Sequence, residues 1–243
     1  MCWNADVASS SSFCCSLIAQ TKPSMKQKIH KYASDKIEVQ YDVARCIHAA
    51  ECVRGLPRAF NPNKRPWIDP DAASAEAIAA VVTRCPTGAL HFTRKEGGSE
   101  EAVPCTNTIT IDPDGPLYVR GDIEVTTSDG TLLLKDTRVA LCRCGASDNK
   151  PFCDGSHAEA GFQDPGLYRD VQVQPPTDES VSGLLRVQPS KDGPFLMQGV
   201  FELCSAGDQE SVLASQTALC RCGQSGNKPF CDGSHKKAGF KSG

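Results

Sequence analysis

The sequence predicts an α+β protein in which a small mixed α/β module precedes two copies of a β-rich module. The first observation is an internal repeat, because residues 115–162 align without gaps on residues 193–240 at a constant offset of 78. The second is an alternation of apolar and polar residues at the start of each copy, which is typical of strands. The third is a strand, helix and strand pattern upstream of the repeat.

The composition favours several small modules over one large core. The chain has 243 residues, of which 40% are hydrophobic and only 6% aromatic. Such modules are often stabilised in part by metal. The net charge of −3 supplies no basic field, so we expect no nucleic-acid partner. No apolar run approaches the roughly 18 residues of a membrane span, so we expect no span either.

Fourteen cysteines allow either a disulfide framework or metal ligation in a reducing compartment. Nine of them fall into three compact groups, and two of these groups end in a histidine, which no disulfide requires. We therefore expect an intracellular, reducing location, with the cytoplasm favoured and an organelle matrix as the alternative. Residues 1–24 do not resemble a secretory signal, because Asp6 and a run of serines interrupt the apolar residues.

Strand and turn signals divide the chain into modules. Apolar positions alternate in both copies, and turns are indicated at Asp114-Gly115-Pro116 and Asp192-Gly193-Pro194. Residues 95–104 are charged and residues 163–182 contain three prolines, so both are predicted to be linkers. We expect an unstructured extension at 1–24 and modules at 25–95, 105–165 and 183–243.

Each copy carries the ligand pattern Cys-x-Cys-x8-Cys-x3-His. The residues are Cys142, Cys144, Cys153 and His157, and Cys220, Cys222, Cys231 and His235. A helical turn capped by Asp154 or Asp232 would place the last cysteine and the histidine of each set on one face. Three cysteines and a histidine can hold zinc as well as an iron–sulfur cluster, although zinc sites usually space their paired cysteines more widely. The pattern alone therefore does not decide between zinc and iron.

The strings CRCGASDNKPFCDGSH and CRCGQSGNKPFCDGSH resemble the mitoNEET-like CDGSH iron–sulfur family. The resemblance implies a 2Fe–2S cluster in each copy, held by the four residues of its ligand set. Because such sites occur in pairs, the tandem implies an intramolecular pseudo-dimer. One histidine in place of a thiolate leaves the oxidised site less negative, which raises its potential. Arg143, Lys150, Arg221 and Lys228 either offset this charge or are solvated surface residues.

The first module carries a third cysteine group. Ile37, Val39 and Tyr41 predict a strand, and Asp69 with Pro70 is expected to start a helix. This helix has an apolar stripe of Ala75, Ile78, Ala79 and Val82. RCIHAAECVRGLPRAF followed by CPTGAL resembles divergent mono-cluster ferredoxins. The resemblance implies Cys46, Cys52 and Cys85 as ligands, with Ala49 at the usual middle cysteine.

With one thiolate missing, the resemblance implies a 3Fe–4S cluster, or a 4Fe–4S cluster with one open iron. His48 lies beside the gap, but a lone histidine is more often a surface or packing residue. A small α/β domain with buried free cysteines is the structural alternative. Cys2, Cys14, Cys15, Cys105 and Cys204 have no ligand-like neighbours in the sequence, and the last two are expected in strands or at strand edges.

These observations predict a multi-cluster electron-transfer protein whose partners are redox proteins. The first alternative is a cluster donor to apo iron–sulfur acceptors, or a redox or iron sensor. The second alternative is a zinc-bound interaction module. No nucleophile–base pair or nucleotide fingerprint appears, so we do not expect an enzyme. The chain is expected to be a monomer with an internal pseudo-dimer.

Overall fold

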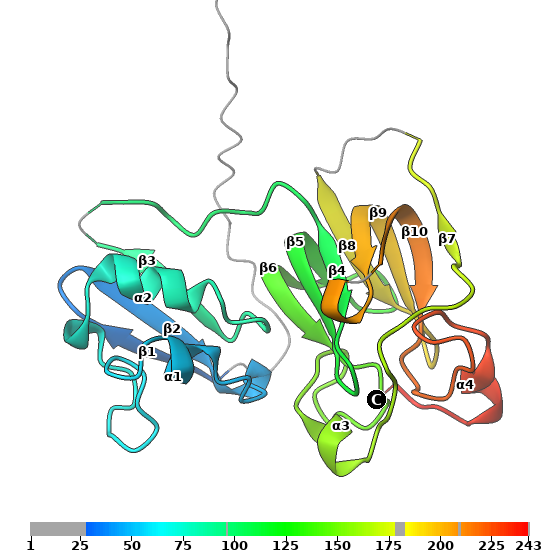
Figure 1. The fold of residues 1–243 in the computed structure, drawn as a ribbon, viewed down its shortest axis with the longest axis horizontal. Helices are drawn as coiled ribbons and strands as arrows, with labels where there is room; N and C mark the ends of the chain where they lie inside the picture. Colours follow the sequence, from blue (N-terminus) through cyan, green and yellow to red (C-terminus); the bar gives the residue numbers. More distant parts are fainter. Residues whose placement is uncertain (1–27, 96, 178–182, 209, 243) are drawn as a thin grey trace, which may run out of the picture.

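The computed structural model describes residues 28–95, 97–177, 183–208 and 210–242. The expected extension at 1–24 lies outside these residues. A smaller α/β lobe and a larger β lobe lie side by side (Figure 1). Among the described residues, no helix is both long enough and apolar enough to cross a bilayer.

The first lobe is built on a three-stranded antiparallel sheet in the order β1-β2-β3. The strands are β1 (Ile29–Ala33), β2 (Ile37–Asp42) and β3 (Leu90–Arg94). Ile37 and Val39 are fully buried, which confirms the strand predicted from their alternation. In the ladder, Val39 stands opposite Tyr32 on one side and Phe92 on the other.

Helices α1 (Glu51–Gly55) and α2 (Ala75–Val82) accompany this sheet, together with the 3₁₀ turns η1 (Val43–Arg45) and η2 (Pro70–Ala72). The predicted apolar stripe of α2 is buried in the core of the lobe. The predicted start was wrong. The Asp69 carboxylate accepts the Asp71 N–H and begins η2, whereas the hydroxyl of Ser74 accepts the Ala77 N–H and caps α2.

The second lobe contains a seven-stranded mixed sheet formed by both copies. The first copy contributes β4 (Thr108–Ile111), β5 (Leu117–Thr126), β6 (Leu132–Leu141) and the short helix α3 (Ser156–Glu159). The second contributes β8 (Leu184–Pro189), β9 (Phe195–Cys204), the turn η3 (Ala206–Asp208), β10 (Ser211–Leu219) and α4 (Ser234–Lys237).

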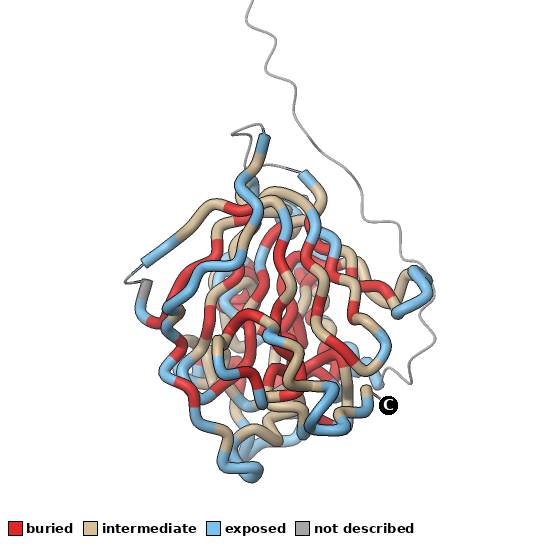
Figure 2. Tube along the Cα trace, turned by 90° about the vertical axis from the view of Figure 1, so that its right-hand side faces the viewer, coloured by how far each residue is buried: buried red, intermediate tan, exposed pale blue. Residues whose placement is uncertain are grey.

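The two copies pair reciprocally. Strand β4 is antiparallel to β5 of its own copy and parallel to β9 of the other. Strand β8 is antiparallel to β9 and parallel to β5. Asn107 reinforces this pairing, because its side-chain amide donates to the carbonyls of Gly183 and Val200 in the second copy. One hydrophobic core therefore serves both copies, and its buried residues follow the strands (Figure 2).

The predicted linkers are only partly linkers. Within 163–182, strand β7 (Val173–Gln174) pairs with β10, and Asp164 is buried. Within 95–104, the Glu101 side chain is largely buried between His91 of the first lobe and Arg138 of β6. Cys204 ends β9 as expected, whereas Cys105 is exposed and lies before β4. These segments are held by polar contacts that local sequence patterns do not reveal.

Candidate metal centres

Each repeated ligand set folds into two close pairs. In the first copy, the Sγ atoms of Cys142 and Cys144 lie 3.6 Å apart, and Cys153 Sγ lies 3.3 Å from Nδ1 of His157. The corresponding distances in the second copy are 3.7 Å and 3.4 Å. The structure thus brings together, pair by pair, all eight residues singled out in the two repeats.

Strand pairing and one carboxylate shape each loop. Strand β6 runs directly into Cys142, and Cys153 returns to it by donating its N–H to Ala140. The Asp154 carboxylate accepts the N–H groups of Asp148 and Ser156. Gly155, with φ of +94°, immediately precedes α3, so Asp154 binds the first turn from one residue further back than predicted. The short helix then sets His157 beside Cys153.

The thiols sit in unlike electrostatic surroundings. The hydrogen bond with Cys144, helped by backbone N–H groups of the loop, lowers the pKa of Cys142 to about 6. Burial raises the pKa of Cys153 to about 11. Cys142, Cys153 and Cys220 are each at most 3% exposed. A bound metal would compensate the burial of these thiolates, because it supplies the positive charge that solvent does not.

The spacing within each cysteine pair is that of two ligands on one metal ion. Two thiolates on one tetrahedral ion, each at about 2.3 Å, lie about 3.8 Å apart, close to the spacing of each cysteine pair. Among the described residues, no three histidine, cysteine or acidic side chains stand close enough together to hold a single ion. Each cysteine pair therefore has the spacing of two ligands on one metal ion.

The arginines inside the ligand patterns have structural roles. Arg143 is 2% exposed and donates to Asp164 at 2.5 Å and to the carbonyls of Gly115 and Asp112. Arg221, 4% exposed, donates to the Ser190 carbonyl. Of the two roles weighed for these residues, solvated surface charge is therefore wrong for both, because the guanidinium groups close the loops against the preceding strand turns.

The two ligand loops touch one another. A Cβ added at Gly145 would lie 2.9 Å from the carbonyl oxygen of Cys222, and one at Gly223 would lie 2.6 Å from that of Cys144. Contacts this close leave no space for a side chain at either position. The loops of the two sites therefore meet backbone to backbone, at the same end of the β lobe (Figure 1).

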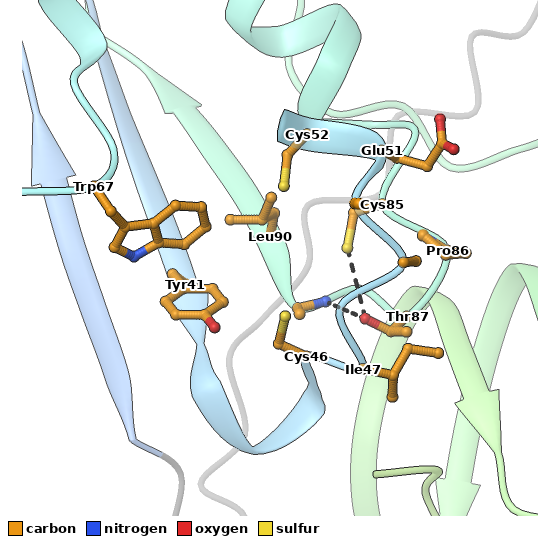
Figure 3. Close-up of a pocket in the computed structure, with 13 residues that line it drawn as sticks. Tyr41, Cys46, Ile47, Glu51, Cys52, Trp67, Cys85, Pro86, Thr87 and Leu90 are labelled. Carbon is orange, nitrogen blue, oxygen red and sulfur yellow. Dashed lines mark hydrogen bonds between the residues drawn. The ribbon is translucent and has the colours of Figure 1, made fainter. Parts of the chain in front are cut away.

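The third cysteine group lines a pocket in the first lobe. Cys46 follows η1, Cys52 lies on α1, and Cys85 follows α2. Their sulfur atoms point toward a common space, with Tyr41 and Trp67 on one side (Figure 3). The pocket encloses about 340 Å³ of empty space including its open mouth. Burial raises the pKa of Cys52 to about 11. Three convergent thiols fit a metal cluster.

The position that a fourth cysteine ligand would occupy in this pocket holds an alanine. Ala49 and Ala50 line the pocket where the middle cysteine would stand. His48 is exposed and is not among the lining residues, so the structure does not favour it as a ligand. His48 and Ala50 both have positive φ, at 59° and 63°. Non-glycine residues rarely adopt this conformation, and they cluster at functional sites.

A buried ionic network joins the first lobe to the first copy, and the sequence did not reveal it. Arg45 donates to the Asp136 carboxylate at 2.6 Å, and its guanidinium lies 5.9 Å from the Phe152 ring centroid. Arg138 reaches back, pairing with Glu101 and donating to the Cys85 carbonyl at 3.3 Å. The one signal in the sequence was a charged residue on a strand of the first copy only. Arg138 corresponds to the uncharged Gln216 in the second copy.

Comparisons with known proteins agree with this arrangement. A family model described as "Divergent 4Fe-4S mono-cluster" matches residues 32–95. A model described as "Iron-binding zinc finger CDGSH type" matches residues 114–158 and 192–236. Two relatives, both called "Uncharacterized protein YjdI", come from Escherichia coli K12 and O157:H7. Each is 39% identical over 64 residues, which cover 26% of this chain and 84% of the relative. No solved structure matches.

Proposed function

Because the chain belongs to the divergent 4Fe-4S mono-cluster family through its first lobe and to the CDGSH iron-binding family through its two repeats, we propose that it is an electron-transfer protein. It would hold two 2Fe–2S clusters in the repeats. The first lobe would hold one 3Fe–4S cluster, or a 4Fe–4S cluster with one open iron. The chain would act as a carrier rather than an enzyme, in a reducing compartment.

The ligand geometry supports these cluster types. In a 2Fe–2S cluster each iron takes two protein ligands, and the repeats offer two close pairs. Cys142 and Cys144 would bind one iron, and Cys153 and His157 the other. The pocket of the first lobe offers three thiols, with Ala49 in the fourth position, which suits three irons. Once bound, such clusters supply reversible one-electron chemistry.

The observation that carries the proposal is that the three sites are joined in series by direct contacts. Asn149, inside the first repeated loop, donates to the Ala44 carbonyl at 2.7 Å, two residues before Cys46. Arg45 adjoins Cys46 and lies over the ring of Phe152, which adjoins Cys153. Beyond this junction, the loop of Cys144 touches Gly223 of the second copy. Electrons could therefore pass through protein contacts along the whole series.

We also propose that the two repeats form an intramolecular pseudo-dimer. The reciprocal pairing of β4 with β9 and of β8 with β5 supports it, because each copy uses the other in the same way. The mutual contacts of Gly145 and Gly223 extend this symmetry to the ligand loops. A chain arranged in this way would need no second copy of itself to bring two CDGSH sites together.

A potentiometric titration of anaerobically purified protein tests the proposed function. We expect iron and sulfide sufficient for three clusters, an EPR signal of a 3Fe–4S cluster in the oxidised protein, and reversible one-electron reduction of each cluster. Iron would remain bound through several cycles. Loss of iron on the first reduction would contradict a role in electron transfer, and zinc in place of iron would contradict all three cluster assignments.

One observation favours the alternative of cluster donation. His157 and His235 are only half-buried, so protons can reach the imidazoles that would bind iron. A site with such a ligand can release its metal when the histidine is protonated. The two functions separate in a mixture with an apo-ferredoxin. Colour that moves to the acceptor without added reductant would favour donation, whereas colour that stays with this chain would favour electron transfer.

A further inference from the structure

The two CDGSH sites have the same ligands but different surroundings. Asn149 ties the first loop to the first lobe, whereas the corresponding Asn227 donates to Asp170, in the segment that follows the first copy. Figure 1 shows α4 on the side of the β lobe away from the first lobe. The first site is thus partly covered by the chain itself, and the second site faces outward.

Four lysines lie on the segments beside the outward-facing site, and we call them the lysine cluster: Lys191, Lys236, Lys237 and Lys241. Lys236 and Lys237 follow His235 directly on α4. Lys241 bonds Asp192 at 3.2 Å, which holds the end of the chain against the turn that contains Lys191. A Cβ added at Gly193, in the same turn, would lie 3.8 Å from Nε2 of His235. The four lysines therefore belong to α4, to the segment that follows it and to the turn beside the candidate ligand His235.

These lysines are available to a partner. All four are exposed. Of these four lysines, only Lys241 forms an ion pair with another described residue. The first copy has none of them. The positions 78 residues earlier are occupied by Pro113, Ala158, Glu159 and Gln163. Counted over these four positions and the aspartates that both copies share, the second copy has a net charge of +2 (with Asp192 and Asp232), whereas the first has −3 (with Asp114 and Asp154).

We propose that the lysine cluster is a docking surface for an acidic redox protein, which exchanges one electron with the second CDGSH site. This inference rests on the proposed function. The electron would leave the reduced cluster held by Cys220, Cys222, Cys231 and His235 and reduce the oxidised centre of the partner, with no bond made or broken. The series of sites would then run from the first lobe, through the first copy, to this surface.

The size of the cluster favours a redox protein over a polyanion. Redox encounters use small interfaces, and their association is steered by complementary charge. Nucleic acids and anionic membranes call for extended basic surfaces, whereas this chain carries a net charge of −3 overall. Four lysines on the segments beside one candidate ligand place positive charge where an acidic protein must approach to receive an electron.

The chain supplies its own matched controls. Lys236→Ala with Lys237→Glu gives the second site the residues of the first, and Ala158→Lys with Glu159→Lys does the reverse. The probe is an acidic plant-type 2Fe–2S ferredoxin, titrated into the oxidised, full-length protein by calorimetry. We expect one site at low ionic strength, with affinity that falls at about 0.15 M salt. The first variant should bind about tenfold more weakly, and the second should gain a second site.

Several outcomes would overturn the docking surface. They are an unchanged affinity in the Lys236 and Lys237 variant, no salt-sensitive binding by the natural chain, or binding to phosphatidylserine vesicles or heparin without binding to the ferredoxin. If that variant loses its clusters, Lys191→Gln with Lys241→Gln gives the same test away from the ligands. Reversible reduction is measured without a partner, so failed docking with intact redox cycling rejects the surface and leaves electron transfer standing.

Discussion

Gly145 and Gly223 determine how closely the two CDGSH loops approach. Both have positive φ, +83° and +76°, and each faces a backbone carbonyl of the opposite loop. Gly239 has a similar φ of +62° but has nothing within 4 Å of where its Cβ would stand. The three glycines therefore separate two effects. All share the backbone strain that a side chain would introduce, but only the first two also share the close contact.

We expect Gly223→Ala to destabilise the protein by about 3 kcal/mol, because strain adds to a clash with the Cys144 carbonyl. Gly239→Ala should cost only about 1 kcal/mol, because it introduces the strain alone. Urea unfolding of both variants, followed by circular dichroism, measures the difference. Equal losses in the two variants would show that the loops do not meet as closely as described.

The eight candidate CDGSH ligands could be singled out from sequence because they lie within two short motifs, and the structure brings them together in close pairs. The role of Arg143 could not, since its partners Asp164 and Gly115 lie 21 and 28 residues away. Local patterns describe what neighbouring residues do together. They do not show which distant carboxylate or carbonyl a guanidinium will meet, and such contacts decide whether a charge is solvated or buried.

Strands β6 and β10 occupy equivalent places in the two copies but carry different chemistry. Asp136 and Arg138 of β6 face the first lobe, and the corresponding residues of β10 are Ala214 and Gln216. Strand β10 instead pairs with β7 through Gln216 and Thr217. The first lobe can therefore dock on only one of the two copies, and strand β6 selects which.

Arg138→Gln gives β6 the residue of β10 and should loosen this junction. It leaves the Glu101 carboxylate and the carbonyls of Val82 and Leu90 without their guanidinium partner. Removing one partner of a buried ion pair costs about 3 kcal/mol or more. Arg120→Gln, at an exposed position opposite Arg138 on β5, is the control. Thermal unfolding of the two variants should differ clearly, and matching melting curves would refute the structural role of Arg138.

Periodicity predicted β2 and the stripe of α2, since both are set by alternating burial within one element. It did not predict where α2 begins, because Asp69 and Ser74 are both good caps and only packing chooses between them. Strand β7 was also missed. Two residues among prolines have no periodicity, and they become a strand only because β10 offers an open edge.

The whole molecule is organised by contacts between modules, and these lie furthest beyond prediction from sequence. The repeat revealed that two copies exist, and the family resemblance implied that they pair. Neither showed that Arg45 would reach Asp136, 91 residues away, and fix the first lobe against the first copy. The buried charged groups of this network find their hydrogen-bonding partners only when both modules are in place. The network therefore specifies the relative position of the two modules.

His91 makes this junction sensitive to alkaline pH. Its ring lies 2.9 Å from the Glu101 carboxylate and 3.1 Å from that of Asp136, with Arg138 close by. Burial lowers the pKa of His91, but the two carboxylates outweigh it and raise the pKa to about 9. Despite burial, the cationic ring lowers the pKa of the Glu101 carboxyl in turn, and Arg45 together with this ring lowers that of Asp136. Because the pKa of the folded state is raised, the stabilisation is complete below about 6.5 and disappears as pH rises through 9.

We therefore expect the free energy of unfolding to fall between about pH 6.5 and 9 by more in the natural chain than in His91→Gln. The glutamine keeps hydrogen-bonding capacity but cannot titrate, so the difference between the two curves isolates the histidine from lysines and thiols that ionise in the same range. Urea unfolding at several pH values measures both curves. Parallel curves over this range would mean that His91 is not cationic in the folded protein, and that the junction relies on its arginines alone.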